Sequence, residues 1–255
     1  MNGVGYLLRG LKLLPHPRVR PFVVVPLLLN FVLFGLGFYY LFDLMGFLQD
    51  KVEAWLPDLL SWLSFLVFPV VFVVALLLVF YTFTIIANIL GSPFNGVLAE
   101  RVEELAKGKP PVTTDAESWK AVIAGAPGAI FNELGKLLYM VKWMIIGSIL
   151  TIIAMFSVVM APMIPVILFM IAAWLLAVEY ADYATDNNGL RASQSRALLK
   201  RQRFHAMGFG GAAVLMTWIP LLNLLAMPAS VAGATLMWVE QLEGVWTQEL
   251  ASRES

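Results

Sequence analysis

The sequence predicts an all-α, polytopic integral membrane protein with two long transmembrane helices and two re-entrant (hemi-penetrating) helical hairpins. The first observation is the composition: of the 255 residues, 60% are hydrophobic and 13% are charged, and the mean hydropathy is +0.81. This charged fraction is about half of what a soluble domain uses to cover its surface. The second observation is that four stretches contain no Asp, Glu, Lys or Arg, namely residues 21–42, 59–99, 143–178 and 204–239.

The first two uncharged stretches predict two full crossings of the bilayer. A helix needs about 20 residues to cross ~30 Å of hydrocarbon, so residues 21–42 form one span and residues 59–90 form a second, longer one. A basic amphipathic segment, residues 1–20, precedes the first span. No small-residue cleavage site is present there, which favours an uncleaved helix over a signal peptide.

A helix boundary is predicted directly after the second span, at the segment GSPFNG of residues 91–96. Ser92 followed by Pro93 is typical of a helix start, with serine as the N-cap and proline in the first helical position. The new helix is expected to reach about residue 106. The region 93–142 is accordingly predicted to hold amphipathic, cytoplasmic helices.

The stretches 143–178 and 204–239 are too long for one ordinary crossing, and prolines break each of them near its middle. The breaks are at APMIP, residues 161–165, and at IPLLN, residues 219–223. Proline ends or kinks a helix, so each stretch is predicted to form two halves of about 16 residues, which reach ~24 Å. Each stretch is then either one bent crossing or a hairpin that returns to the side it came from.

Basic residues prefer cytoplasmic loops, and their distribution favours hairpins. Segments 1–20, 100–142 and 179–203 carry four, six and five Lys or Arg residues, whereas 43–58 carries one against four acidic residues. With two hairpins and a cytoplasmic tail, 240–255, 16 of the 17 basic residues lie inside. A true double crossing in each hairpin gives the same sidedness and stays open. A hairpin tip at membrane depth needs partners for its backbone groups, which predicts a homo-oligomer, a polar cavity, or both.

Several classes of function are excluded or disfavoured by what the sequence lacks. The net charge is zero, so the predicted partners are the lipid bilayer and further copies of the chain, with no nucleic acid. Cysteine is absent, and His16 and His205 stand alone without metal-ligand spacing. We therefore predict no enzyme, no catalytic residue, no metal site and no cofactor. No charged residue interrupts an apolar stretch, which favours a passive, channel-like mechanism.

Arg18 and Arg20 precede the first predicted span and are flanked by prolines. A helix start presents backbone N–H groups and a positive dipole end, and the arginine fork suits a tetrahedral oxyanion. These residues are therefore candidates for an anion site. The alternative is that they only anchor the helix among lipid head groups.

Polar side chains within or next to the uncharged stretches are candidates for lining a passage. An amide without partners is costly there, so these side chains either face a polar passage or form hydrogen bonds between helices. Glu103, in the cluster of charges at 100–104, either solvates a helix end or lies at a pore mouth. The predicted pore-lining residues are Asn30, Asn88, Asn95, Glu103 and Asn223.

The segment GSPFNGVLAE, residues 91–100, resembles the pattern APFNGLLAE of the bacterial CysZ sulfate permeases. Further segments agree in order and spacing. They are GLKL at 10–13, PRVR at 17–20, PLLLN at 26–30, Asp182-Tyr183, Asp186-Asn187, IPLLN at 219–223, Met227-Pro228, and GAT before MWV at 233–239. The similarity extends over about residues 5–240.

The resemblance implies a bacterial inner-membrane, multi-pass oligomer that admits sulfate for cysteine biosynthesis, as a permease or channel. It also implies the architecture of two long helices with hemi-penetrating hairpins. In this family a Leu/Ile-Arg-Arg element near the first long helix binds sulfate. Val19 and Arg20 match its first part, Pro21 stands in place of the second arginine, and Arg18 is a substitute contact. The rival hypothesis is a membrane scaffold or assembly protein without transport activity.

Overall fold

The computed structural model describes residues 2–55, 64–110, 120, 138–155 and 161–254, and every regular element in these ranges is a helix. The predicted all-α class is confirmed. The chain divides into two compact units. We call Val24–Gly91 the long-helix unit, and Met1–Val23 together with Ser92–Ser255 the core unit.

Five helical segments of the described ranges are long and apolar enough to cross a membrane, which confirms a multi-pass membrane protein. They are Pro21–Val52, Val67–Thr84, Leu138–Met155, Ala161–Asn187 and Pro220–Gln248. In the first four, 6 to 17% of the apolar window is buried, so most of it is free to face lipid. In the fifth, 67% is buried inside the protein. Apolar segments in this chain are therefore of two kinds: four that leave most of their surface exposed, and one that packs inside the protein.

Both long helices exceed their predicted spans. Helix α2, Pro21–Trp55, has 35 residues and continues through the acidic segment that was expected to be a loop from residue 43. Its length is about 50 Å at the usual rise per residue, which is more than the hydrocarbon requires. Helix α3, Ser64–Ala106, has 43 residues. The predicted beginning of the second span, residues 59–63, lies outside the described residues.

The predicted helix boundary at 91–96 is wrong, because α3 runs through it without interruption. Proline costs a helix one backbone hydrogen bond. In an apolar environment every remaining backbone bond favours the helix strongly, so internal prolines are tolerated there. The division between the two units nevertheless falls at Gly91 and Ser92, within this segment. Of the region 93–142, residues 111–119 and 121–137 lie outside the described part.

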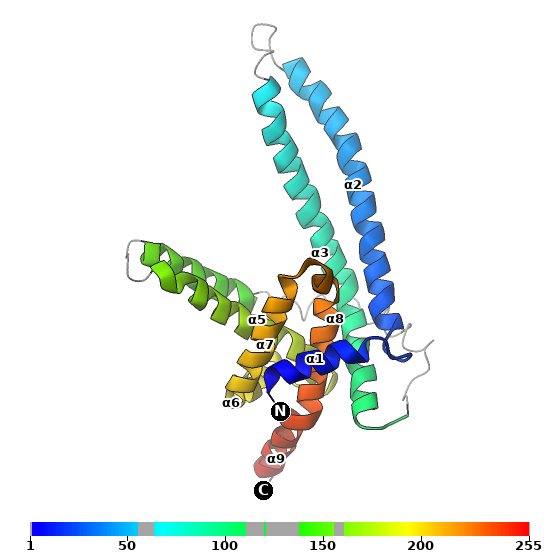
Figure 1. Ribbon diagram of the computed structural model, residues 1–255, viewed down its shortest axis with the longest axis vertical. Coiled ribbons are helices and arrows are strands. Elements are labelled where there is room, and N and C mark those ends of the chain that lie inside the picture. The colour runs from blue at the N-terminus through cyan, green and yellow to red at the C-terminus, as the bar shows by residue number, and fades with distance from the viewer. Residues whose placement is uncertain (1, 56–63, 111–119, 121–137, 156–160, 255) are drawn as a thin grey trace. The chain divides into compact units, whose positions relative to one another are not determined.

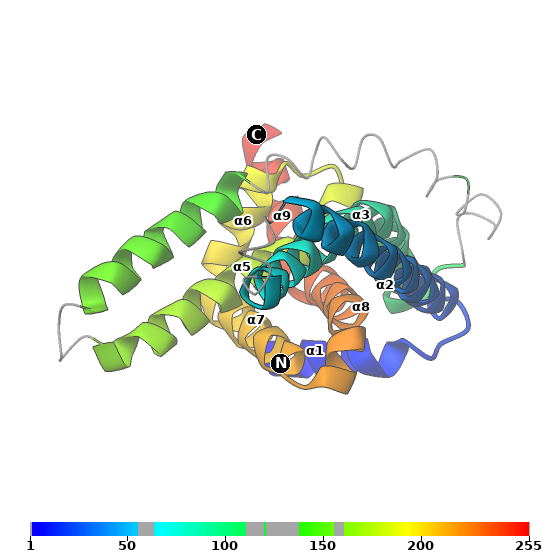
Figure 2. The same cartoon turned by 90° about the horizontal axis from the view of Figure 1, so that it is seen from above.

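Within the long-helix unit, α2 and α3 run antiparallel, side by side (Figures 1 and 2). Leu41 and Met45 of α2 pack with Ala75 of α3 in a small buried cluster. Farther along, the rings of Phe34 and Phe80 lie 6.2 Å apart. Most other large apolar side chains of this unit are exposed, as expected of helices surrounded by lipid.

The proline breaks predicted in the last two uncharged stretches coincide with helix ends. The helical residues Leu138–Met155 are followed, beyond residues outside the described part, by a short 3-10 turn at Ala161–Met163 and then by α5, Ile164–Asn187. Helix α7, Arg203–Thr217, ends just before α8, Pro220–Met237, which has proline in its first position. A short helix, α6 (Ala192–Arg201), joins α5 to α7.

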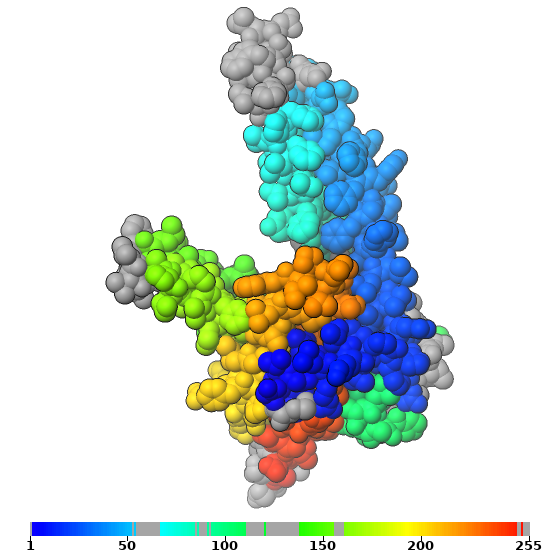
Figure 3. Space-filling model, viewed as in Figure 1, coloured from blue at the N-terminus to red at the C-terminus, as the bar shows by residue number. Residues whose placement is uncertain are grey.

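Helix α1, Gly3–Leu13, packs across α7 and α8 and completes the core unit (Figures 1 and 3). One face of α1 is buried, formed by Gly3, Tyr6, Leu7 and Gly10. A methyl group added at Gly10 would meet the backbone of Ala229 and Gly233 on α8. Backbone contact at this distance requires glycine. The basic N-terminal segment is therefore part of the core and more than a surface anchor.

Helix α8 continues without a break into a π-helical turn, Trp238–Leu242, and then into α9, Glu243–Glu254. The predicted tail from residue 240 is thus helical up to Glu254. Such π-turns widen a helix by one residue per turn and are frequent at functional positions. Here the turn carries Glu240, which faces Arg9 of α1.

Candidate functional site

The predicted anion site lies in the turn that connects α1 to α2. Val19 is fully buried, whereas its neighbours Arg18 and Arg20 are exposed. The buried valine fixes the turn against the core unit, and the two guanidinium groups flank it at the surface. Neither guanidinium forms an ion pair with the described part of the chain, so both remain available to a ligand.

The backbone of this turn does not offer the free N–H groups that were expected of a helix start. The N–H groups of Val19 and Arg20 both donate to the carbonyl oxygen of His16, at 2.9 Å, and that of Arg18 donates to His16 Nδ1 at 3.3 Å. Phe22 and Val23 donate to Val19 and Arg20 at 3.1 Å. Helical turns ahead of α2 therefore already use these donors, and recognition of an anion here depends on the arginine side chains.

The five predicted pore-lining residues are divided between the two units of the chain. Asn30 and Asn88 belong to the long-helix unit, and the other three belong to the core unit. Asn223 is exposed near the start of α8. Asn95 is buried, and its amide lies 3.6 Å from the sulfur of Met227, which supports the alternative that it joins two helices.

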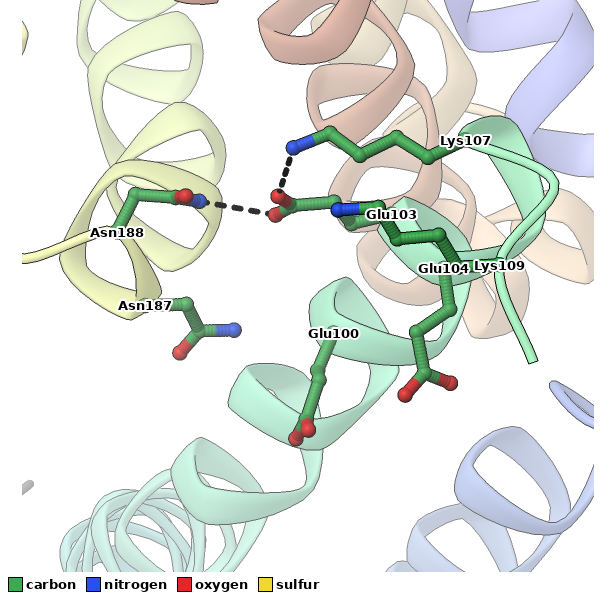
Figure 4. A pocket seen from close by; sticks show the side chains of 7 residues that line it. All are labelled: Glu100, Glu103, Glu104, Lys107, Lys109, Asn187 and Asn188. Atoms are coloured by element: carbon green, nitrogen blue, oxygen red, sulfur yellow. Dashed lines mark hydrogen bonds and ion pairs between the residues drawn. The ribbon is translucent and has the colours of Figure 1, made fainter. Parts of the chain in front are cut away.

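Glu103 is the predicted residue that lines a pocket, of about 390 Å³, at the end of α3 (Figure 4). Its carboxylate accepts hydrogen bonds from Lys107 Nζ at 2.6 Å and from Asn188 Nδ2 at 2.9 Å. Lys107 also donates to Glu243 of α9 at 2.6 Å. Lys107 and Glu103 therefore tie together α3, the end of α5 and α9.

Three carboxylates and two lysines line this pocket, together with Asn187 and Asn188. Burial and the nearby Glu104 raise the pKa of Glu100 above the ordinary carboxyl value. For Lys107, burial lowers the pKa, but the hydrogen bonds that its ammonium group donates to Glu103 and Glu243 outweigh this effect, and the net pKa is raised. Glu103 and Lys107 are bonded to each other and to neighbouring elements, so the pocket lies at a junction of α3, the end of α5 and α9.

Two of the other charges in the cluster at 100–104 do not solvate the helix end. Arg101 and Glu104 are both buried, and Arg101 Nη1 lies 3.0 Å from Glu104 Oε2. Removing one partner of such a buried ion pair strongly destabilises the protein, because the other charge is left buried without a partner. Within the part of the chain that the structure describes, no three His, Asp or Glu side chains lie close enough to hold a metal ion.

Sequence reasoning missed that three of its motif segments meet in space. Asn187, in the Asp186-Asn187 segment, donates to the carbonyl oxygen of Gly96 at 2.7 Å. Asn95, from the same α3 segment, reaches Met227 of the Met227-Pro228 segment. The signal was present in the motifs themselves, but one sequence contains no information that pairs them.

Comparison with known proteins places these features in context. A family model described as sulfate transporter CysZ/etoposide-induced protein 2.4 matches residues 6–228. A "Sulfate transporter CysZ" of Pseudomonas aeruginosa is 39% identical over 251 residues, which cover 94% of this chain and 96% of the relative. Proteins of the same name from Vibrio parahaemolyticus and Salmonella typhimurium are each 37% identical, over 95% and 94% of this chain and 96% and 92% of their own.

Proposed function

Since the chain belongs to the family of sulfate transporter CysZ/etoposide-induced protein 2.4, we propose that it carries sulfate into the cell for cysteine biosynthesis. Relatives that cover nearly the whole chain bear the name sulfate transporter CysZ, and this observation carries the proposal. The chain supplies no covalent chemistry in this function. Its task is to recruit a dianion and to provide a path across the bilayer.

Arg20 and Arg18 are the proposed recruiting groups. They are exposed cations on either side of the buried Val19, at the start of a helix long enough to cross the membrane. Their forks can each donate two hydrogen bonds to a tetrahedral oxyanion. Because the backbone donors nearby are already used, the two side chains are the proposed hydrogen-bond donors to sulfate.

Uptake of radioactive sulfate by sealed liposomes that contain only the purified chain tests the proposal. We expect uptake down a sulfate gradient without ATP, and no uptake by protein-free liposomes. Absence of flux at every gradient would contradict transport and favour the rival scaffold function. Chloride uptake in the same vesicles is the control for leakage.

For the arrangement in the membrane we propose two full crossings, by α2 and α3, and two re-entrant hairpins in the bacterial inner membrane. The short α7 supports it, because its 15 residues reach only about 22 Å, which is less than the thickness of the hydrocarbon. Large apolar side chains are exposed around the α7–α8 connection, among them Trp218 and Leu221. A tip of this kind is suited to insertion in lipid while the rest of the hairpin packs inside the protein.

Single cysteines and a membrane-impermeant thiol reagent test this topology, because the native chain has no cysteine. Asp50→Cys and Ser193→Cys are expected to react from opposite faces of the membrane. Met163→Cys, near the first proline break, separates the two remaining cases. Labelling from the outer face means a true double crossing, and no labelling from either face of sealed vesicles means a re-entrant tip.

We further propose that the protein acts as a homo-oligomer. Backbone groups at a re-entrant tip need protein or water around them, and apolar surface on the Leu138–Met155 helix is largely exposed in the single chain. Native mass spectrometry in mild detergent gives the number of copies. A strictly monomeric protein that still transports sulfate would contradict this part of the proposal.

A further inference from the structure

A second pocket of the core unit, of about 550 Å³, is lined by basic side chains that take no part in the sites described above. Lys142, Lys200 and Arg203 contribute three positive charges from three separate elements, and none of the described residues that line the pocket is a carboxylate. All three cations are exposed, and none forms an ion pair with the described residues. The pocket therefore attracts a negatively charged group from outside the chain.

Aromatic side chains form a fixed wall of the same pocket. Trp174 Nε1 donates to the hydroxyl of Tyr139 at 2.9 Å, and the Trp143 ring lies edge-on to Tyr139 at 6.5 Å. The guanidinium of Arg196 stacks over the Tyr139 ring at 4.5 Å. These contacts join the Leu138–Met155 helix, α5 and α6, so the wall is held in place before any ligand binds.

The pocket lies where polar sequence gives way to apolar sequence. Lys142 directly precedes the uncharged stretch 143–178, and Arg203 directly precedes the stretch 204–239. Beyond these two residues, apolar side chains are exposed, with Met144 at 64% and Phe204 at 80%. Tryptophan and tyrosine concentrate at the membrane–water interface, and lysine and arginine there extend toward the head groups.

We propose that this pocket binds the phosphate head group of an anionic phospholipid, with Arg203, Lys200 and Lys142 holding the phosphate oxygens. Basic pockets between transmembrane helices on the cytoplasmic side suit such head groups. The exposed apolar side chains beside it give the acyl chains a surface to lie on. A small soluble anion would gain nothing from that surface, and the solvated cations alone hold such an anion only weakly.

Lipid titration followed by native mass spectrometry tests the proposal on the full-length chain in neutral detergent. The probes are phosphatidylglycerol, phosphatidylcholine with the same acyl chains, and inorganic sulfate. We expect phosphatidylglycerol to bind at least tenfold more tightly than phosphatidylcholine. In the triple variant Lys142→Gln, Lys200→Gln, Arg203→Gln this affinity should fall roughly 100-fold, at about fivefold for each basic residue near an anionic head group.

The matched control removes three exposed lysines that do not line the pocket, by Lys12→Gln, Lys51→Gln and Lys120→Gln. Its net charge changes equally, and its affinity for phosphatidylglycerol should stay that of the parent. Equal losses in both variants, or no preference between the two lipids, would overturn the proposal. Loss of sulfate binding with phosphatidylglycerol binding retained would also overturn it and identify a soluble-oxyanion site.

A single substitution keeps the proposal testable if the triple variant fails to fold. Lys200→Gln changes an exposed residue of α6 and should weaken phosphatidylglycerol binding about fivefold, while Lys200→Arg should restore it. A purely structural role of Lys200 would lower the melting temperature without changing the preference between the two lipids.

Discussion

Arg9 and Glu240 are 231 positions apart in sequence, and their side chains form two parallel hydrogen bonds, of 3.0 and 2.6 Å. The pair closes the N-terminal helix α1 onto the π-turn that follows α8. Tyr6 lies beneath it, and burial together with its hydrogen bond to Glu240 raises the pKa of the Tyr6 hydroxyl to about 12. The first helix of the core unit is thus connected to the π-turn between α8 and α9.

A double-mutant cycle measures this contact. Arg9→Ala and Glu240→Ala should each destabilise the protein, and the double variant should lose less than their sum. Because both side chains are partly exposed, we expect a coupling energy of about 0.5–1 kcal/mol. Thermal unfolding in detergent provides the free energies, and strict additivity of the two single losses would show that the pair contributes nothing.

Sulfate affinity should depend on the arginines that flank Val19. Arg20→Ala is expected to weaken sulfate binding about tenfold, since a charge-assisted bidentate contact is lost, and Arg18→Ala to weaken it as well. Arg20→Lys keeps the charge but loses the planar fork, so its sulfate affinity should lie between that of Arg20→Ala and that of the parent protein. Isothermal titration with sulfate checks this. Lys12→Ala is the control, and unchanged affinity in Arg20→Ala would remove the site.

Replacing Glu100 should stabilise the protein at neutral pH. Its pKa is raised in the folded state by burial and by Glu104, so the folded protein binds a proton more readily than the unfolded chain does. Stability is then lost as pH rises from the ordinary value near 4.5 through the raised pKa. Glu100→Gln should therefore gain less than about 1 kcal/mol at pH 7 and nothing below that window, as melting temperatures measured across pH would show.

Glu103, one helical turn away, should respond in the opposite direction. Glu103→Gln weakens the contact with Lys107 and changes that with Asn188, so it should cost about 1 kcal/mol at neutral pH. The same melting series serves both variants. If Glu100→Gln and Glu103→Gln shifted the melting temperature in the same direction at neutral pH, the assigned environments would be wrong.

The contact of α1 with α8 should not accept a side chain at Gly10. The added methyl of Gly10→Ala would meet the backbone of Ala229 and Gly233, and overpacking of this kind costs about 1–3 kcal/mol. Gly244→Ala in α9, where nothing lies within 4 Å, should instead stabilise the helix by up to about 1 kcal/mol. Equal effects in the two variants, measured by thermal unfolding, would contradict the packing.

The fold class and several helix ends could be predicted because they depend on local chemistry. Hydropathy identified the apolar helices, and Pro220 marked the start of α8. The boundary predicted at Ser92 and Pro93 failed, because the same local signal is overridden when a helix in apolar surroundings keeps its backbone bonded. Hydropathy also could not distinguish the buried α8 from the lipid-facing helices, since lipid and protein interior are equally apolar.

Local sequence by itself thus determined the class of the protein and identified Arg18 and Arg20 as exposed cations at the start of a long helix. Only the tertiary structure decided that Val19 is buried between them, that Asn188 donates to Glu103, and that Asn187 reaches Gly96. The physical reason is the sequence separation over which each interaction acts. Hydrophobicity and helix breaking act over a few neighbouring residues, whereas a hydrogen bond between distant segments exists only once packing has brought both partners within about 3 Å.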